Sequence, residues 1–152
     1  MKRLLSLLVI AVLGAGLTGC KSVPQPPDPD AVSEWIQEQS ASDRPGLATM
    51  AGAPRNASGP TTEGEESITV DFASATSVTG VEFSCFGEES MSVAFELRGA
   101  AETRSTGSDD LVCADSPHLL PEALDGVIGV SVSGTSEHGS GAWSVVVLGE
   151  EQ

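Results

Sequence analysis

The sequence is poor in aromatic and basic residues. Its 152 residues contain no tyrosine, two tryptophans and four phenylalanines, and seven lysines and arginines stand against 22 aspartates and glutamates. The formal net charge of −15 excludes nucleic acid as a partner, because binding to phosphates depends on lysine and arginine. The shortage of aromatic residues argues against a glycoside hydrolase, whose paired carboxylates need side chains that position the sugar.

Long apolar runs and catalytic motifs are also missing. The longest mostly apolar stretch runs from Leu4 to Leu17, which is shorter than the roughly 20 residues that span a bilayer. The chain has no phosphate loop, no dinucleotide fingerprint, no zinc-protease helix and no Gly-x-Ser-x-Gly nucleophile turn. We therefore expect no enzymatic activity.

The N-terminus has the layout of a secretory signal peptide. Lys2 and Arg3 precede the apolar stretch, and small residues lead to a cysteine in Leu17-Thr18-Gly19-Cys20. This segment resembles the lipobox of bacterial lipoproteins. The resemblance implies that residues 1–19 are removed and that the Cys20 sulfur is lipidated, so that the protein is anchored to the cell membrane on its extracytoplasmic face. Two or three acyl chains would hold it stably, since each buried CH₂ contributes about 0.8 kcal/mol.

The mature chain is strongly acidic. Removal of residues 1–19 takes away two basic residues and leaves five against 22 acidic ones, a net charge of −17. Such a chain has no basic patch for anionic lipids, so its contact with the membrane depends on Cys20. Residues 20–29 are rich in proline and predict a stiff stalk. In composition and layout the chain resembles small lipoproteins of actinobacteria.

Two further cysteines, Cys85 and Cys113, remain for the domain. An even pair in an exported protein indicates a disulfide, which would stabilise the fold by about 3.5 kcal/mol. A metal site that combines these cysteines with His118 is the alternative, but it has too few ligands at the spacing that zinc requires.

Residues 30–41 are predicted to form one short amphipathic helix, because Val32, Trp35 and Ile36 recur at helical spacing. Residues 42–66 are rich in Ala, Gly, Ser, Thr and Pro and predict a flexible linker. Trp35 and Phe86 are the two aromatic residues that we expect outside the core.

Residues 67–149 are predicted to form an all-β domain, an antiparallel β-sandwich of jelly-roll-like or Ig-like type. Apolar and polar residues alternate with the period of half-buried strands. Turns that join hairpins are expected at residues 87–90 and 134–140. The six expected strands place these residues on inward faces: Ile68, Val70, Phe72; Val81, Phe83, Cys85; Met91, Val93, Phe95, Leu97; Leu111, Cys113; Ile128, Val130, Val132; Trp143, Val145, Val147. The sixth is apolar on both faces and should be central.

A few polar residues are candidates for chemistry. Asp109, Asp110, Asp115 and Glu137 lie in expected loops, where carboxylates can hold calcium or contact a carbohydrate. His118 and His138 are the histidines on which an enzyme hypothesis would centre, and both are interpreted as ordinary turn or loop residues.

We therefore expect a non-catalytic binding or structural module at the cell envelope, with an envelope protein or polysaccharide as partner. A carbohydrate-binding or calcium-binding module is the alternative, and an enzyme without recognisable motifs is a third hypothesis.

Overall fold

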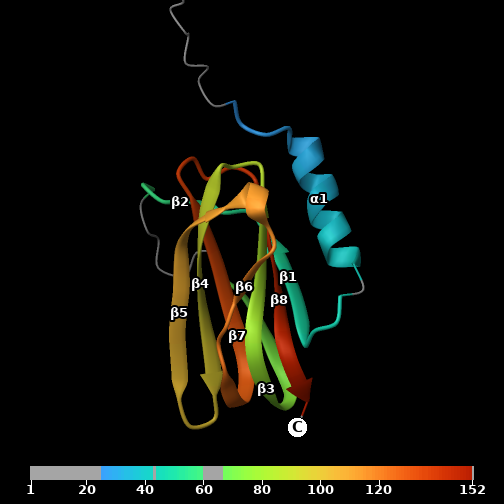
Figure 1. Ribbon diagram of the computed structural model, residues 1–152, viewed down its shortest axis with the longest axis vertical. Coiled ribbons are helices and arrows are strands. Elements are labelled where there is room, and N and C mark those ends of the chain that lie inside the picture. The colour runs from blue at the N-terminus through green and yellow to red at the C-terminus, as the bar shows by residue number, and fades with distance from the viewer. Residues whose placement is uncertain (1–24, 43, 60–66, 152) are drawn as a thin grey trace, which may run out of the picture.

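The computed structural model describes residues 25–42, 44–59 and 67–151. These residues form one helix, α1 (Pro29–Ala41), and a mostly antiparallel β-sheet (Figure 1). The all-β prediction with one N-terminal helix is confirmed at this level. The remaining elements are β1 (Ala48–Gly52), β2 (Arg55–Asn56), β3 (Ile68–Phe86), β4 (Ser90–Gly99), β5 (Thr103–Val112), the short 3₁₀ helix η1 (Cys113–Asp115), β6 (His118–Leu120), β7 (Leu124–Ser136) and β8 (Ala142–Glu151).

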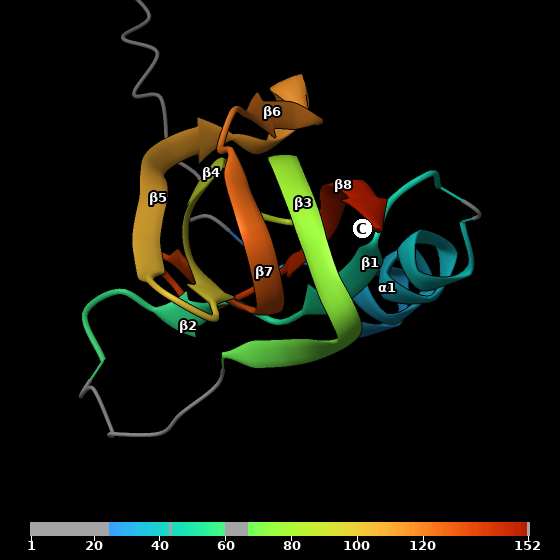
Figure 2. The ribbon, with the colours of Figure 1, turned by 90° about the horizontal axis from the view of Figure 1, so that it is seen from below.

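The eight strands belong to one sheet whose main path has the order β1-β8-β3-β7-β4-β5. Off this path, β2 pairs with β7 in parallel and β6 pairs with β3. Figure 2, seen along the strands, shows the sheet curling around its interior. One face of the sheet therefore encloses the core.

β3 unites two expected strands in a single element. Its first part, from Ile68 to Asp71, pairs with β7. Its second part, from Thr76 to Phe86, pairs with β8, and Thr76 and Val78 also pair with β7. The register shifts between these parts, and Figure 2 shows the strand bending there. The strand continues without a break because β8 becomes a second partner at Thr76, where pairing with β7 resumes.

The two expected hairpins are wrong, although both turns exist. β3 and β4 are joined by a tight turn but do not pair, since β7 lies between them in the sheet. β7 and β8 are likewise separated by β3. The hairpin that does form joins β4 to β5, where the Gly99 amide donates to the Glu102 carbonyl at 2.8 Å. Turn residues identify a reversal of the chain, but they do not identify the neighbouring strand.

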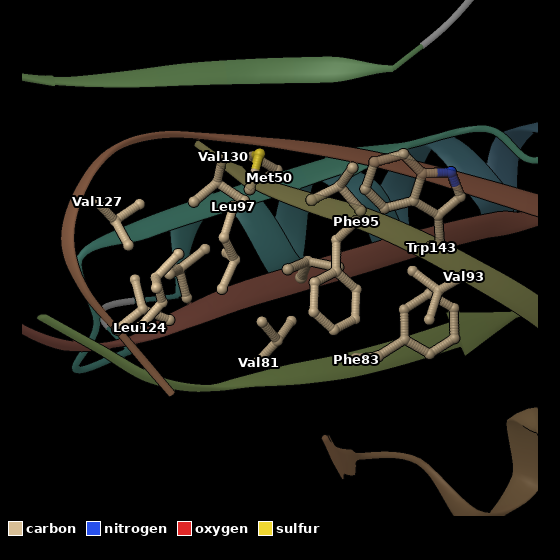
Figure 3. Close-up of a cluster of buried hydrophobic side chains, with 14 of the residues drawn as sticks. Met50, Val81, Phe83, Val93, Phe95, Leu97, Leu124, Val127, Val130 and Trp143 are labelled. Carbon is tan, nitrogen blue, oxygen red and sulfur yellow. The ribbon is translucent and has the colours of Figure 1, made fainter. Parts of the chain in front are cut away.

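The predicted inward faces of the second, third and sixth expected strands are buried in the core, and those of the first and fourth are half-buried and pack against it. Phe83, Phe95 and Trp143 converge in its interior (Figure 3), and the Trp143 indole donates to the Ala53 carbonyl at 3.0 Å. On β7 the alternation changes phase at Gly129, so that Val127 is buried and Ile128 is 39% exposed. The prediction that Ile128 points inward is therefore wrong.

β8 is buried on both faces over residues 142–147, as its apolar composition indicated. β1 and β3 flank it in the sheet, and α1 packs against β1 and β8. The linker prediction is wrong for residues 48–52, because β1 pairs with β8 along its whole length and buries Met50, and for residues 55–56, which pair with β7 as β2. Small residues suit this edge strand, because a Cβ at Gly52 would meet the Trp143 ring at 3.1 Å. Residues 60–66 of the expected linker lie outside the described part.

The helix begins one residue earlier than expected. Pro29 occupies its first turn and Asp28 is the N-cap, whose carboxylate accepts from the Asp30 amide at 3.0 Å. Trp35 stacks on Phe86 with 5.9 Å between ring centroids. Both rings lie outside the hydrophobic core, as expected, and each partly covers the other.

Candidate functional site

One end of the sheet collects the features that most resemble a site. The β3–β4 turn, residues 87–89, and the β7–β8 loop, residues 137–141, lie together there, at the top of Figure 1. Both segments contain glycines with positive φ, Gly87 at 91° and Gly141 at 88°. A Cβ at Gly141 would lie 2.2 Å from the Phe86 carbonyl oxygen, so glycine permits the two segments to approach each other.

Glu88 connects the two segments. Its carboxylate accepts from the Ser140 hydroxyl at 2.6 Å, from the Ser140 amide at 3.3 Å and from the Ser136 hydroxyl at 3.3 Å. The second carboxylate oxygen lies 3.3 Å from Nδ1 of His138. The Glu88 side chain is only 11% exposed, whereas that of His138 is 50% exposed. The Glu88 carboxylate therefore holds the β7–β8 loop against the β3–β4 turn by hydrogen bonds.

The surroundings of Glu88 favour its ionised form. Burial acts to raise the pKa of the carboxyl, but the hydrogen bonds from Ser140 and His138 outweigh it and hold the pKa below its ordinary value. The Ser140 amide and the charge of His138 act in the same direction. Glu88 is thus a fixed negative charge at neutral pH.

A pocket of about 440 Å³ opens beside Glu88. Its lining comes from the turn, from the loop and from the first described residues of the chain: Gln25, Pro26, Gly87, Glu88, Glu89, Ser90, Glu137, His138 and Ser140. Among the described residues, three carboxylates and no lysine or arginine line it. The pocket is therefore negatively charged and carries hydroxyl groups at its wall.

The order of contacts in this pocket differs from that of a serine hydrolase. In such an enzyme the imidazole lies between the hydroxyl and the carboxylate, so that it can take the hydroxyl proton. Here the Glu88 carboxylate lies between Ser140 and His138. In the described structure the Ser140 hydroxyl donates to a carboxylate, which does not prepare it for nucleophilic attack.

His118 lies elsewhere. It is the first residue of β6, and its Nε2 atom lies 2.8 Å from the Val112 carbonyl oxygen. This contact secures β6 against the end of β5 and provides no carboxylate partner.

The four candidate carboxylates do not converge. Asp110 and Glu137 line a second hollow of about 290 Å³ that adjoins the first pocket. Asp109 is exposed on β5 and Asp115 is exposed in η1. Asp110 has a φ of +53°, and its amide donates a hydrogen bond to the Ser92 hydroxyl oxygen at 3.3 Å in an irregular part of the β4–β5 pairing. Within the described ranges no three His, Cys, Asp or Glu residues are placed to hold a metal ion.

The cysteines follow the predicted pairing. Cys85 and Cys113 form a disulfide with 4.9 Å between their Cα atoms. The alternative metal site with His118 is therefore wrong, because both thiols are used in the bond. Cys20 and the signal sequence lie outside the described residues, and in the described part no helix is long and apolar enough to cross a membrane.

Sequence reasoning missed Glu88. It assigned Gly87-Glu88-Glu89-Ser90 only to a turn, and nothing in that pattern distinguishes Glu88 from Glu89. The available signal was the serine spacing around His138, in Ser136-Glu137-His138-Gly139-Ser140, which offers several donors within one short loop. Comparison with protein-family models, with curated proteins and with solved structures found no match for this chain.

Proposed function

We propose that the protein is a lipid-anchored module on the extracytoplasmic face of the cell membrane, where it serves the envelope as a non-catalytic binding or structural component. The observation that carries this proposal is the Cys85–Cys113 disulfide. Disulfides are typical of exported proteins, and this one leaves Cys20 as the single remaining cysteine. That cysteine directly follows the apolar leader, at the position that a lipobox requires.

The non-catalytic part of the proposal is supported by the order of groups around Glu88. The carboxylate uses its hydrogen bonds to hold the β7–β8 loop, and Ser140 donates its hydroxyl proton to it. These hydrogen bonds hold the β7–β8 loop in one position and make the end of the sheet rigid. A rigid domain of this kind suits recognition or assembly with an envelope protein or polysaccharide.

In fold terms we propose that the domain is related to the β-sandwiches of jelly-roll or Ig type. The β3–β4 turn and the β7–β8 loop each connect strands that do not pair with each other. Connections of this kind lead from one side of a core to the other, as they do between the layers of a sandwich. Because all eight strands are hydrogen-bonded in one curled sheet, the two layers of this sandwich would be connected by strand pairing at their edges.

The anchor is tested with Cys20→Ala in cells that express the full chain. We expect the wild-type protein to sediment with membranes and to incorporate a clickable fatty acid, and we expect the variant to lose both properties. Ser22→Ala is the matched control, because it alters a neighbouring small residue and leaves the cysteine. Membrane sedimentation and labelling that persist in Cys20→Ala would refute the proposal.

A second candidate, a carbohydrate-binding or calcium-binding module, is favoured by one observation. Asp110 and Glu137 line the same hollow together with hydroxyl groups of Ser90 and Ser92. Titration with calcium, or with a panel of envelope oligosaccharides, should raise the melting temperature of the wild-type chain. It should do so less for Asp110→Asn/Glu137→Gln, while Asp109→Asn serves as control. No thermal shift with any of these ligands would remove this candidate.

A further inference from the structure

The described chain enters the domain at the end of the sheet that carries Glu88. Gln25 and Pro26 line the pocket there, and Figure 1 shows this N-terminal segment crossing above that end. Pro27 lies against the β3–β4 turn, because a Cβ at Gly87 would meet its ring at 2.8 Å. The second half of the expected stalk is therefore part of the domain surface and does not act as a spacer.

The residues that follow Pro27 are also held in place by the domain. Asp28 caps α1, and its carbonyl accepts from the Val32 amide at 3.0 Å. The stack of Trp35 on Phe86 then holds the helix at the end of β3, immediately before the turn. The exit of the chain toward Cys20 thus has a defined place on the domain.

Little chain remains between this exit and the proposed anchor. Cys20 precedes Gln25 by five residues, and five residues span at most about 18 Å when fully extended. The sheet is much longer than this tether, since the ten residues of β4 extend over about 33 Å. The exit end must stay near the lipid, whereas the opposite end is free to lie far from it.

We propose that the end of the sheet formed by the β3–β4 turn and the β7–β8 loop faces the bilayer surface, and that the β4–β5 turn and the C-terminal end of β8 face away. This inference rests on the proposed anchor at Cys20. The facing surface carries Glu88, Glu89 and Glu137, and the described residues that line the pocket include no lysine or arginine. It therefore fits a bilayer with zwitterionic head groups, because anionic head groups would repel these carboxylates.

The orientation is tested by coupling residues 20–152 to a maleimide lipid in zwitterionic vesicles. The Cys20 thiol is the attachment point, since the other two cysteines are in the disulfide. A donor dye is attached through an azide-bearing residue at position 137 in one preparation and at position 101 in another, and the acceptor lies at the bilayer surface. Positions 137 and 101 are both exposed and lie in loops at opposite ends of the sheet.

Energy transfer from position 137 should be at least about twice that from position 101, because the two ends are separated by about 30 Å of strand. Equal transfer, or more from position 101, would overturn the orientation. Replacing zwitterionic by anionic lipid at low salt should reduce transfer from position 137, and unchanged transfer would overturn the head-group preference.

A matched control lengthens the tether. A flexible insertion of about 20 Gly and Ser residues after Ser22 should bring the ratio of the two transfers close to one, because such a linker no longer constrains the domain. A ratio that stays at two with the long tether would show that contacts other than the tether orient the domain, and would overturn the proposed cause. Because the lipid is attached chemically, failure here is separable from failure of the Cys20→Ala test in cells.

Discussion

Single side chains decide how the end of the sheet is closed. Glu88 binds four donor groups, one from Ser136 at the end of β7 and three from His138 and Ser140 of the β7–β8 loop, although it is one of 22 acidic residues in the chain. Gly134 has an equally specific role, because a Cβ there would lie 2.4 Å from the Trp143 ring. A charge buried among donors and a glycine packed against an indole are both consequences of close approach between distant residues.

Glu88→Gln should lower the free energy of unfolding by about 1–2 kcal/mol at pH 7, because a charged acceptor is replaced by a neutral one. The pKa of Glu88 in the folded chain lies below its ordinary value of 4.5. Its stabilisation is therefore complete above pH 4.5 and is lost as the pH falls through the folded value. Urea unfolding between pH 3 and pH 7 measures the difference between the wild type and the variant.

The neighbouring Glu89→Gln is the control for Glu88→Gln, since Glu89 is exposed in the same turn and should contribute under about 0.5 kcal/mol. A difference between the wild type and Glu88→Gln that is the same at pH 3 and pH 7 would contradict the assignment of the pKa direction to this carboxyl.

Among the strands and the helix, the clearest result is how α1 is held. It contributes no fully buried residue, and its contacts are with β1 and β8, together with the stack of Trp35 on Phe86. A 13-residue helix is marginal in isolation, so these contacts supply its stability. The helix in turn covers the outer face of β8, which explains why that strand is apolar on both sides.

Trp35→Ala should destabilise the docked helix, with a loss of about 2 kcal/mol from the ring stack and its buried area. Trp35→Phe retains a stacking ring and should recover most of this loss. Limited proteolysis combined with urea unfolding would report both effects, and cleavage within residues 29–45 should become faster in the alanine variant. Gln37→Ala, on the exposed side of the helix, serves as control. Equal effects of the two Trp35 variants would contradict a role for the aromatic stack.

For the molecule as a whole, the disulfide is a covalent constraint on a domain that otherwise depends on pairing between distant strands. It joins the end of β3 to η1, which follows the edge strand β5. The two cysteines are 28 residues apart in the sequence. Closing a loop of this size restricts the unfolded chain, and the folded sheet gains stability relative to it.

Reduction of the Cys85–Cys113 disulfide should therefore lower the free energy of unfolding by about 3.5 kcal/mol. Urea unfolding with and without a reductant measures this loss, and Cys85→Ala/Cys113→Ala should reproduce it and become insensitive to the reductant. Cys20→Ser is the control, because it should keep the sensitivity of the wild type. An intact mass without the loss of two hydrogens, or an unchanged unfolding curve under reduction, would contradict the prediction.

The sequence predicted those features that depend on neighbours along the chain. Period-two alternation placed Val81, Phe83 and Trp143 in the core, and helical spacing around Trp35 predicted α1 to within one residue. The count of cysteines gave the disulfide once Cys20 was assigned to the lipid. These inferences succeed because burial of one face and the number of available thiols are properties of local pattern and composition.

Local sequence pattern could not predict which strands pair with each other or how the sheet curls around its core. Alternation says which face of a strand is buried, but backbone hydrogen bonds are alike on every strand, so it does not say which strands are neighbours. For this reason the hairpins around residues 87–90 and 134–140 were wrong, and the small residues of β1 indicated a linker. Glu88 gained its role only when the sheet curled and brought two distant loops together, because its hydrogen bonds join residues about 50 positions apart.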